Sequence, residues 1–175
     1  MKLDSRLSIV LLTFSTLAAG QETKSLDPPP AAPPVQHMFC NTGYKVSDCQ
    51  QQLSVLRAAI APYAQRLGTW TWVLVKSQDW KLILQRMRGN TDSPAFSVLE
   101  KRETFLEEAL FVPVGSRQTE LLRIWSIPLD EFLNVAITHE LGHGICQDLN
   151  EARADVFSRL LLREHKKPEC ATAHR

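Results

Sequence analysis

The chain has 175 residues, and its 20 Lys and Arg almost balance its 19 Asp and Glu. This balance argues against a nucleic-acid-binding protein, which would carry a basic block, and against an acidic disordered tail. The length fits one folded domain behind an N-terminal segment, so indications of function have to come from local chemistry.

Residues 1–20 are typical of a secretory signal peptide. Lys2 and Arg6 give it a basic start, and the apolar run at 7–17 is too short to span a bilayer as a helix. Small residues follow, which predicts cleavage before Gln21. The alternative is an uncleaved membrane anchor. We therefore expect a secreted or periplasmic protein with no stable membrane insertion after signal removal.

The segment 21–36 contains the sequence DPPPAAPP, which favours an extended chain and cannot pack a core. It is predicted to be a Pro-rich linker. The folded domain is then expected to cover residues 37–175.

The four cysteines are an even set in a chain that is expected to leave the cytoplasm, which predicts disulfides. We expect Cys40 to pair with Cys49 and Cys146 with Cys170, because each pair closes a short loop. The second disulfide would tie the segment after His143 to the C-terminal tail. The alternatives are four buried free thiols, or Cys146 as a metal ligand.

A helix is predicted for residues 48–67, with Ser47 or Asp48 as its cap. Pro62 is expected to bend this helix or to end its regular part. Its apolar residues recur at helical spacing and form one stripe: Leu53, Leu56, Ile60 and Tyr63.

A β-rich run at 69–75 predicts a strand with Trp70 and Trp72 on one face. We expect both tryptophans to belong to the core, and a role in substrate binding is the alternative. A short helix is predicted for the following segment, 79–87.

Two further strands are predicted at 95–99 and 104–112. The end of the second is left open, because its sequence EEAL also suits a helix. The strand near 104–114 could accept an extended substrate as an added strand, or it could be an ordinary sheet edge.

The rest of the chain predicts three helices, at 119–125, 129–143 and 151–164. Pro128 starts the second helix, Gly144 stops it, and Asn150 caps the third. The order of helix, strands and C-terminal helices predicts an α+β domain with a small mixed sheet.

The second of these helices contains the pattern His-Glu-x-x-His. His139 and His143 are four residues apart, so they share a helix face and can direct an imidazole nitrogen each at a single Zn²⁺. Glu140 is one step round the helix, where it can take the proton of a water that the metal activates. The alternative is two histidines satisfied within a packed helix. Gly142 argues against it, because glycine weakens a helix and an inert helix has little use for it.

A hydrolytic zinc needs a third protein ligand and one open position. Glu151 would face the metal if the final helix packs back against the His-Glu-x-x-His helix, and Asp148 in the loop is the alternative. Asp155 lies four residues after Glu151. At this position, the Asp155 carboxylate could accept a hydrogen bond from the other ring nitrogen of His139 or His143. The alternative is a surface ion pair with Arg159.

The sequence THELGH, followed by EARAD, resembles the gluzincin clan of zinc metallopeptidases. The Glu-x-x-Ala-Asp element is similar to that of the membrane-bound CaaX-protease family, and the element order and small size resemble the minigluzincins. The resemblance implies a small zincin-like fold that hydrolyses peptide bonds. It also implies zinc on His139, His143 and Glu151, with Glu140 as the general base.

The close match covers about twenty residues. Only seven residues separate His143 from Glu151, which is fewer than in the CaaX-protease family. Leu149 stands where metzincins place a third histidine, so that related clan is excluded.

We therefore expect an exported zinc metallopeptidase acting on peptide or protein substrates. The alternative is a non-catalytic secreted module, with a structural zinc or none, that binds a protein partner. A further alternative is a latent enzyme whose N-terminal segment covers the cleft. The oligomeric state is not indicated.

Four residues are candidates for stabilising an oxyanion, and the sequence does not choose among them: Tyr63, Arg153, Arg159 and His165.

Overall fold

The computed structural model describes residues 32–87, 89–90 and 92–170. The predicted signal peptide, residues 1–20, lies outside the described residues, and so does most of the predicted linker.

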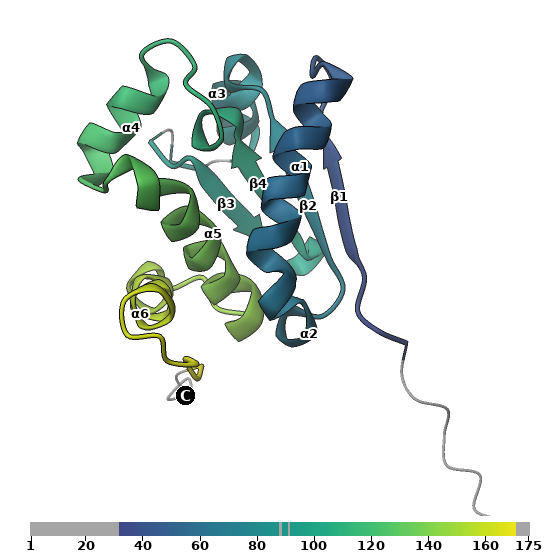
Figure 1. The fold of residues 1–175 in the computed structure, drawn as a ribbon, viewed down its shortest axis with the longest axis vertical. Coiled ribbons are helices and arrows are strands. Elements are labelled where there is room, and N and C mark those ends of the chain that lie inside the picture. Colours follow the sequence, from purple (N-terminus) through teal and green to yellow (C-terminus); the bar gives the residue numbers. More distant parts are fainter. Residues whose placement is uncertain (1–31, 88, 91, 171–175) are drawn as a thin grey trace, which may run out of the picture. The chain divides into compact units, whose positions relative to one another are not determined.

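The fold is α+β and is built around one four-stranded mixed sheet (Figure 1). The strands lie in the order β1 (Gln36–Cys40), β2 (Trp70–Val75), β4 (Glu103–Glu107) and β3 (Ala95–Val98). β1, β2 and β4 are parallel neighbours, whereas β3 runs antiparallel to β4. The predicted class and the small mixed sheet are confirmed.

Strand β1 is not among the predicted elements. It begins at Gln36, inside the stretch expected to be linker, and pairs with β2 from Gln36 opposite Trp70 to Cys40 opposite Leu74. Its hydrogen-bonding partner is far along the chain, with a helix between the two strands. A parallel pairing of this kind leaves no turn signal in the local sequence.

The expectation that the strand near 104–114 is a sheet edge is wrong. β4 hydrogen-bonds to β2 on one side and to β3 on the other, so its backbone has no free edge for a substrate. The sheet ends at β1 on one side and at β3 on the other, and β3 lies next to α5 (Leu129–Cys146). After β4, the sequence EEAL forms the 3₁₀ turn η3 (Glu108–Leu110), the helical alternative for this segment.

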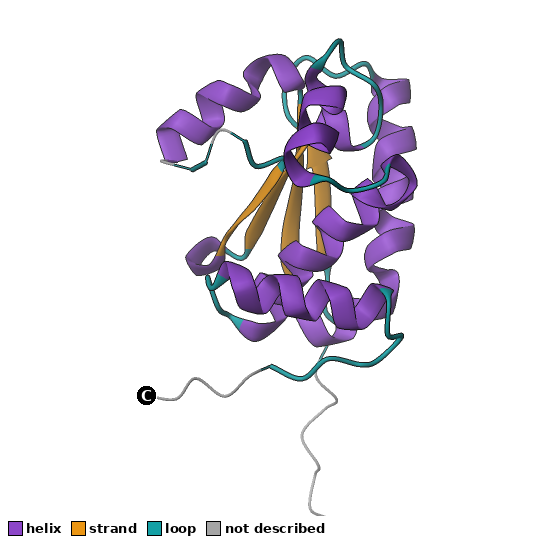
Figure 2. Ribbon diagram, turned by 90° about the vertical axis from the view of Figure 1, so that its left-hand side faces the viewer, coloured by secondary structure: helices purple, strands orange, loops and turns teal. Residues whose placement is uncertain are grey.

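Helices cover both faces of the sheet (Figure 2). Helix α1 (Val46–Ile60) and α5 pack on one face, and α3 (Ser77–Met87) packs on the other. Trp70 and Trp72 are 1% and 0% exposed and belong to the main core, as predicted. The smaller cluster under α3 contains Val73, Val75, Trp80 and Leu84.

Pro62 ends the regular part of the first helix, as predicted. Helix α1 stops at Ile60, and Pro62 lies in the 3₁₀ turn η1 (Ala61–Tyr63). One further helical turn, α2 (Ala64–Leu67), leads to Gly68 and β2. Another 3₁₀ turn, η2 (Leu99–Lys101), joins β3 to β4.

Two predicted helix ends are wrong. Helix α1 is preceded by Lys45, and Ser47 donates to the neighbouring Asp48 within the first turn instead of capping it. Helix α5 continues past Gly144 to Cys146 and ends because Gln147 adopts a left-handed conformation with φ 50°. Gly144 therefore does not end the helix.

Two helices complete the fold, α4 (Arg117–Trp125) and α6 (Glu151–Leu162). Asn150 caps α6 as predicted, because its side-chain oxygen accepts a hydrogen bond from the Arg153 backbone N–H at 3.0 Å. Helix α6 lies across the C-terminal half of α5 (Figure 1). The loop between the two helices is short, so α6 turns back onto α5.

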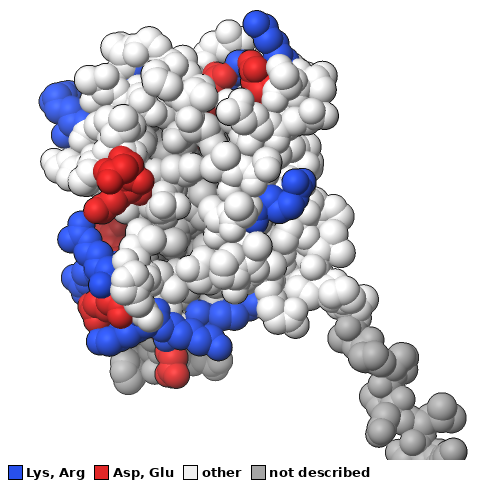
Figure 3. Space-filling view, in the orientation of Figure 1, with Lys and Arg blue, Asp and Glu red and all other residues white. Residues whose placement is uncertain are grey.

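The surface carries no broad region of one charge on the face drawn in Figure 3, where acidic and basic side chains are mixed. None of the helices in the described part of the chain combines the length and apolar character that a bilayer crossing requires.

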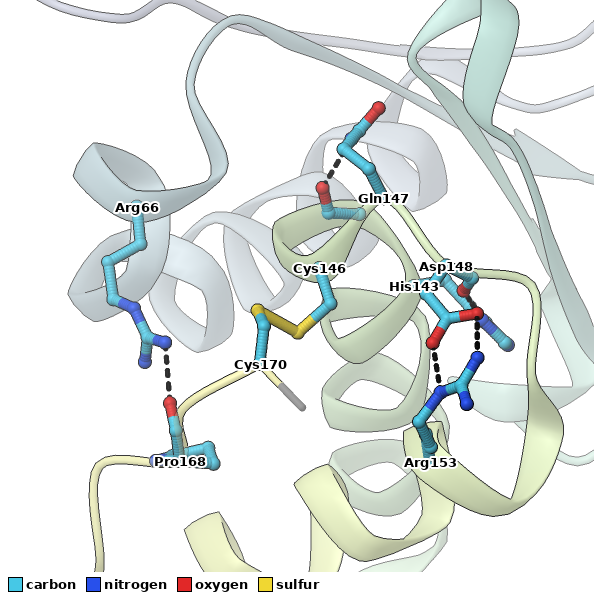
Figure 4. Close-up of a disulfide and its surroundings, with 9 residues drawn as sticks. Arg66, His143, Cys146, Gln147, Asp148, Arg153, Pro168 and Cys170 are labelled. Carbon is cyan, nitrogen blue, oxygen red and sulfur yellow. Dashed lines mark hydrogen bonds and ion pairs between the residues drawn. A yellow bond between two sulfur atoms is a disulfide. The ribbon is translucent and has the colours of Figure 1, made fainter. Parts of the chain in front are cut away.

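Both predicted disulfides are present. Cys40–Cys49 joins β1 to α1, and Cys146–Cys170 joins the end of α5 to the tail that follows α6 (Figure 4). No cysteine is left free as a thiol among the described residues, so the free-thiol and metal-ligand alternatives do not hold. Two disulfides are consistent with an oxidising compartment.

We expect loss of the Cys146–Cys170 disulfide to lower the free energy of unfolding. The bond closes a loop of sequence separation 24, which corresponds to a stabilisation of about 3 kcal/mol through the unfolded chain. Urea unfolding of the Cys146→Ser/Cys170→Ser variant measures it. An unchanged unfolding midpoint would contradict this expectation.

Candidate metal centre

His139 and His143 stand one turn apart on α5 and direct the same ring nitrogen toward each other. Their Nε2 atoms are 3.1 Å apart and the ring centroids 4.8 Å apart. Both rings are largely buried, with 14% and 5% of their side chains exposed. The helix spacing that the sequence shows therefore produces one shared point of convergence.

Glu151 brings a carboxylate to this point from the first turn of α6. Its Oε2 lies 2.9 Å from Nε2 of His139 and 3.6 Å from Nε2 of His143. One ligand atom from each of the three residues lies within 4.8 Å of the others. The Glu151 side chain is 76% exposed, so the assembled group is open to solvent on the α6 side.

The opposite ring nitrogens are held by oxygen acceptors. Nδ1–H of His139 donates to Oδ1 of Asp155 at 2.9 Å, and Nδ1–H of His143 donates to the backbone oxygen of Asp148 at 2.6 Å. With the proton on Nδ1, a neutral imidazole presents a lone pair at Nε2. Two imidazole lone pairs and a carboxylate oxygen therefore converge, an arrangement that a bound cation stabilises.

The Asp148 side chain does not join this group. It forms an ion pair with Arg153, as Figure 4 shows, and this contact holds the pKa of the Asp148 carboxyl below its usual range. Asp148 contributes its backbone carbonyl to His143 instead. The loop carboxylate that was the alternative third ligand thus has a different partner, and Glu151 is the acid at the point of convergence.

Close packing of α6 on α5 brings Glu151 to the histidines. A Cβ on Gly142 would lie 3.1 Å from Cα of Ala154 and 3.2 Å from Cβ of Phe157, which are tighter contacts than side chains normally make. The adjacent contact is polar, because the hydroxyls of Thr138 and Ser158 are 2.6 Å apart. Glycine at 142 therefore allows the short distance between the two helices.

Gly142→Ala should push α6 away from α5 and weaken metal binding by about tenfold, the range seen when supporting contacts of a metal site are altered. Gly144→Ala is the matched control on the same helix. Its Cβ would meet Leu67 and Trp70 in the core rather than α6. We expect it to lower stability by about 1–3 kcal/mol through overpacking, with a smaller effect on metal affinity. Zinc titration and thermal unfolding of both variants separate the two effects, and equal metal affinities would contradict this assignment.

Glu140 lies beside the group, buried under the cleft with 4% of its surface exposed. Ser97 on β3 donates a hydrogen bond to its Oε2 at 2.7 Å. Burial raises the pKa of Glu140 to about 7, against the opposing effects of the Ser97 hydrogen bond and His143. A carboxylate with a pKa near neutrality is suited to proton transfer.

A cleft of about 240 Å³ opens next to these residues. Its lining includes His139, Glu140, His143 and Glu151. Apolar side chains form most of the remaining wall, including Pro94, Phe96, Trp125, Phe132, Val135 and Leu149. The cleft therefore combines a few converging polar groups with an apolar lining, as ligand sites commonly do.

The four candidates for oxyanion stabilisation are not among the residues that line this cleft in the described structure. Arg153 pairs with Asp148, and Tyr63 packs against the main core. Arg159 and His165 are exposed on α6 and in the tail. The oxyanion candidates therefore gain no support from their positions.

Sequence reasoning missed the role of Ser97. The strand that carries it was predicted, but nothing in the local sequence shows that this strand ends the sheet beside α5. It also missed the Asp148 carbonyl, since a backbone contact leaves no residue-type signal.

The three ligand atoms could hold a metal ion. Two imidazole nitrogens and one carboxylate oxygen are donors that suit a divalent transition metal. Comparison of the chain with models of protein families, with curated proteins and with solved structures finds no significant match. Function is therefore inferred from the chemistry of this site.

Proposed function

We propose that the protein is an exported zinc-dependent metallopeptidase that hydrolyses peptide bonds in peptide or protein substrates. The observation that carries the proposal is the convergence of His139, His143 and Glu151 next to a buried carboxylate, Glu140, in the lining of a cleft. The gluzincin resemblance of the sequence supports the same assignment.

The metal would be held by the Nε2 atoms of His139 and His143 and by the carboxylate of Glu151. When bound, zinc supplies Lewis-acid polarisation of a carbonyl and lowers the pKa of a water to about 7. Asp155 and the Asp148 carbonyl keep both rings oriented through Nδ1–H.

Glu140 is the proposed general base. One of its oxygens, Oε2, accepts from Ser97, which leaves Oε1 to take the proton of the attacking water. The same carboxyl group then gives the proton to the leaving amine nitrogen. Its burial in the lining of a largely apolar cleft limits competition from bulk water.

A closed structural zinc site, the basis of the alternative, normally has four protein ligands. Among the described residues, the candidate group contains three, and the third is mostly exposed. A buried carboxylate beside such a group has no function in a closed site. These observations favour catalysis over a non-catalytic binding module.

Hydrolysis of an unfolded protein by purified, metal-analysed protein tests the proposal. We expect about one zinc per chain and cleavage that chelator stops and added zinc restores. Zinc-loaded protein that cleaves neither unfolded proteins nor a mixed peptide library would overturn the assignment.

A further inference from the structure

A line of three hydrogen bonds, one buried and two partly buried, crosses the sheet and ends on Glu140. The indole Nε1–H of Trp70 donates to Oγ1 of Thr104 at 2.9 Å. The hydroxyls of Thr104 and Ser97 are 2.7 Å apart, and Ser97 donates to Oε2 of Glu140 at 2.7 Å. Trp70 and Thr104 are 1% and 0% exposed, so water does not replace the contact between them, whereas Ser97 is half-buried at the cleft.

The direction of the line follows from the hydrogens available. An indole N–H can only donate, so Thr104 must accept from Trp70. Ser97 gives its single hydroxyl proton to the carboxylate, which leaves its oxygen as the acceptor for Thr104. Each hydrogen in the line then has an acceptor when Glu140 is ionised. Each hydroxyl has one orientation that its neighbours set.

The sheet fixes where this line ends. Ser97 on β3 is directly opposite Thr104 on β4, and β4 is in turn paired with β2, which carries Trp70. The three donors thus come from three adjacent hydrogen-bonded strands. Glu140 comes from α5, a separate element, so its carboxylate is held by the sheet as well as by its own helix.

We propose that Ser97, oriented by Thr104 and Trp70, is a positioning residue that holds Oε2 of Glu140 and thereby directs Oε1 toward the water. The inference rests on the proposed peptidase function. A glutamate side chain has several rotatable bonds, and a single rigid donor on one oxygen removes most of its freedom. Small displacements of a catalytic group cost about 100-fold in rate in unfavourable cases.

Ser97→Ala is the first test, because Ser97 is only partly buried and the variant keeps the strand. We expect kcat to fall about 10- to 100-fold with KM changed less than about threefold, since substrate contacts remain. Zinc affinity should not change, because Ser97 touches none of the three ligands. A wild-type kcat in Ser97→Ala would overturn the inference.

Thr104→Val tests the second link at a buried position that no substrate can reach. It has nearly the same shape and lacks the hydroxyl, so Ser97 loses its orienting partner. We expect a smaller fall in kcat, and Thr104→Ser, which keeps a hydroxyl, should recover most of it. In the Ser97→Ala background, Thr104→Val should have no further effect on kcat. If Thr104→Val acted by general destabilisation, the double variant would instead lose the sum of the two single effects on kcat.

The indole proton of Trp70 gives a readout that does not require activity. In ¹⁵N spectra of the metal-free protein, we expect its resonance to move and its exchange with water to rise in Thr104→Val, with a smaller shift in Ser97→Ala. An unmoved indole resonance in both variants would show that the line does not exist. If the spectra change as expected while zinc-loaded wild-type protein is inactive on all substrates, the peptidase assignment fails and, with it, the catalytic role given to Ser97.

Discussion

Glu140→Gln is expected to lower kcat for peptide hydrolysis by about a thousandfold while zinc content stays at the wild-type level. The amide has nearly the same shape and can still accept the Ser97 hydrogen bond through its oxygen, but it cannot take a proton from water. General-base catalysis contributes about 100- to 10,000-fold in enzymes, which sets the size of the effect. Single-turnover assays with metal analysis of the same sample measure both quantities.

The position of the carboxylate makes this substitution informative. Glu140 is buried, contacts Ser97 and provides no atom to the candidate metal group. Loss of activity together with loss of zinc would mean that the residue supports the site's structure instead. Activity retained in a sample free of contaminating proteases would rule out the proposed mechanism.

Glu151→Ala is expected to reduce zinc affinity by more than about 100-fold and to abolish hydrolysis. Removing a partner that only supports a metal ligand commonly costs 10- to 100-fold in affinity, so removal of a ligand should cost more. Asp155→Asn, which weakens the contact to His139 Nδ1, should fall in that intermediate range. Competition titrations against a zinc indicator give the zinc affinities of the wild type and of both variants.

Asp148→Asn is the matched control for the third ligand. Its side chain binds Arg153, while its contact to His143 is made by the backbone carbonyl, which the substitution keeps. We expect zinc affinity within about threefold of wild type, because no side-chain contact to the metal group is lost. Strong zinc loss in Asp148→Asn with retention in Glu151→Ala would reverse the assignment of the third ligand.

Much of the site could be predicted because its determinants are local. Two histidines at helical spacing share a face whatever surrounds them, and Asn150 marks the start of the helix that carries Glu151. The cysteine pairs could be predicted from short loop lengths alone. The contact of Asp155 with His139 follows from its spacing from Glu151 on α6.

The remaining features depend on contacts between distant segments. The sequence does not predict β1, because its parallel partner β2 comes only after a helix. It predicts an edge position for β4, because the sequence of a strand does not show which strands will lie beside it. Ser97 gains its role only because β3 ends the sheet beside α5. The sequence predicts that Gly144 stops the helix, but Gly144 makes room for Leu67 and Trp70 within a helix that continues.

The uneven exposure of the three candidate ligands indicates that folding of the chain does not depend on a bound metal. Both imidazoles are sheltered, but the acid on α6 faces water, and the main apolar core lies around the tryptophans of β2. In zinc fingers the ion replaces a core, and its removal unfolds the chain. Here, the exposed Glu151 lies apart from that core, so we expect the protein to stay folded when the proposed ion is removed and to take it up again without refolding.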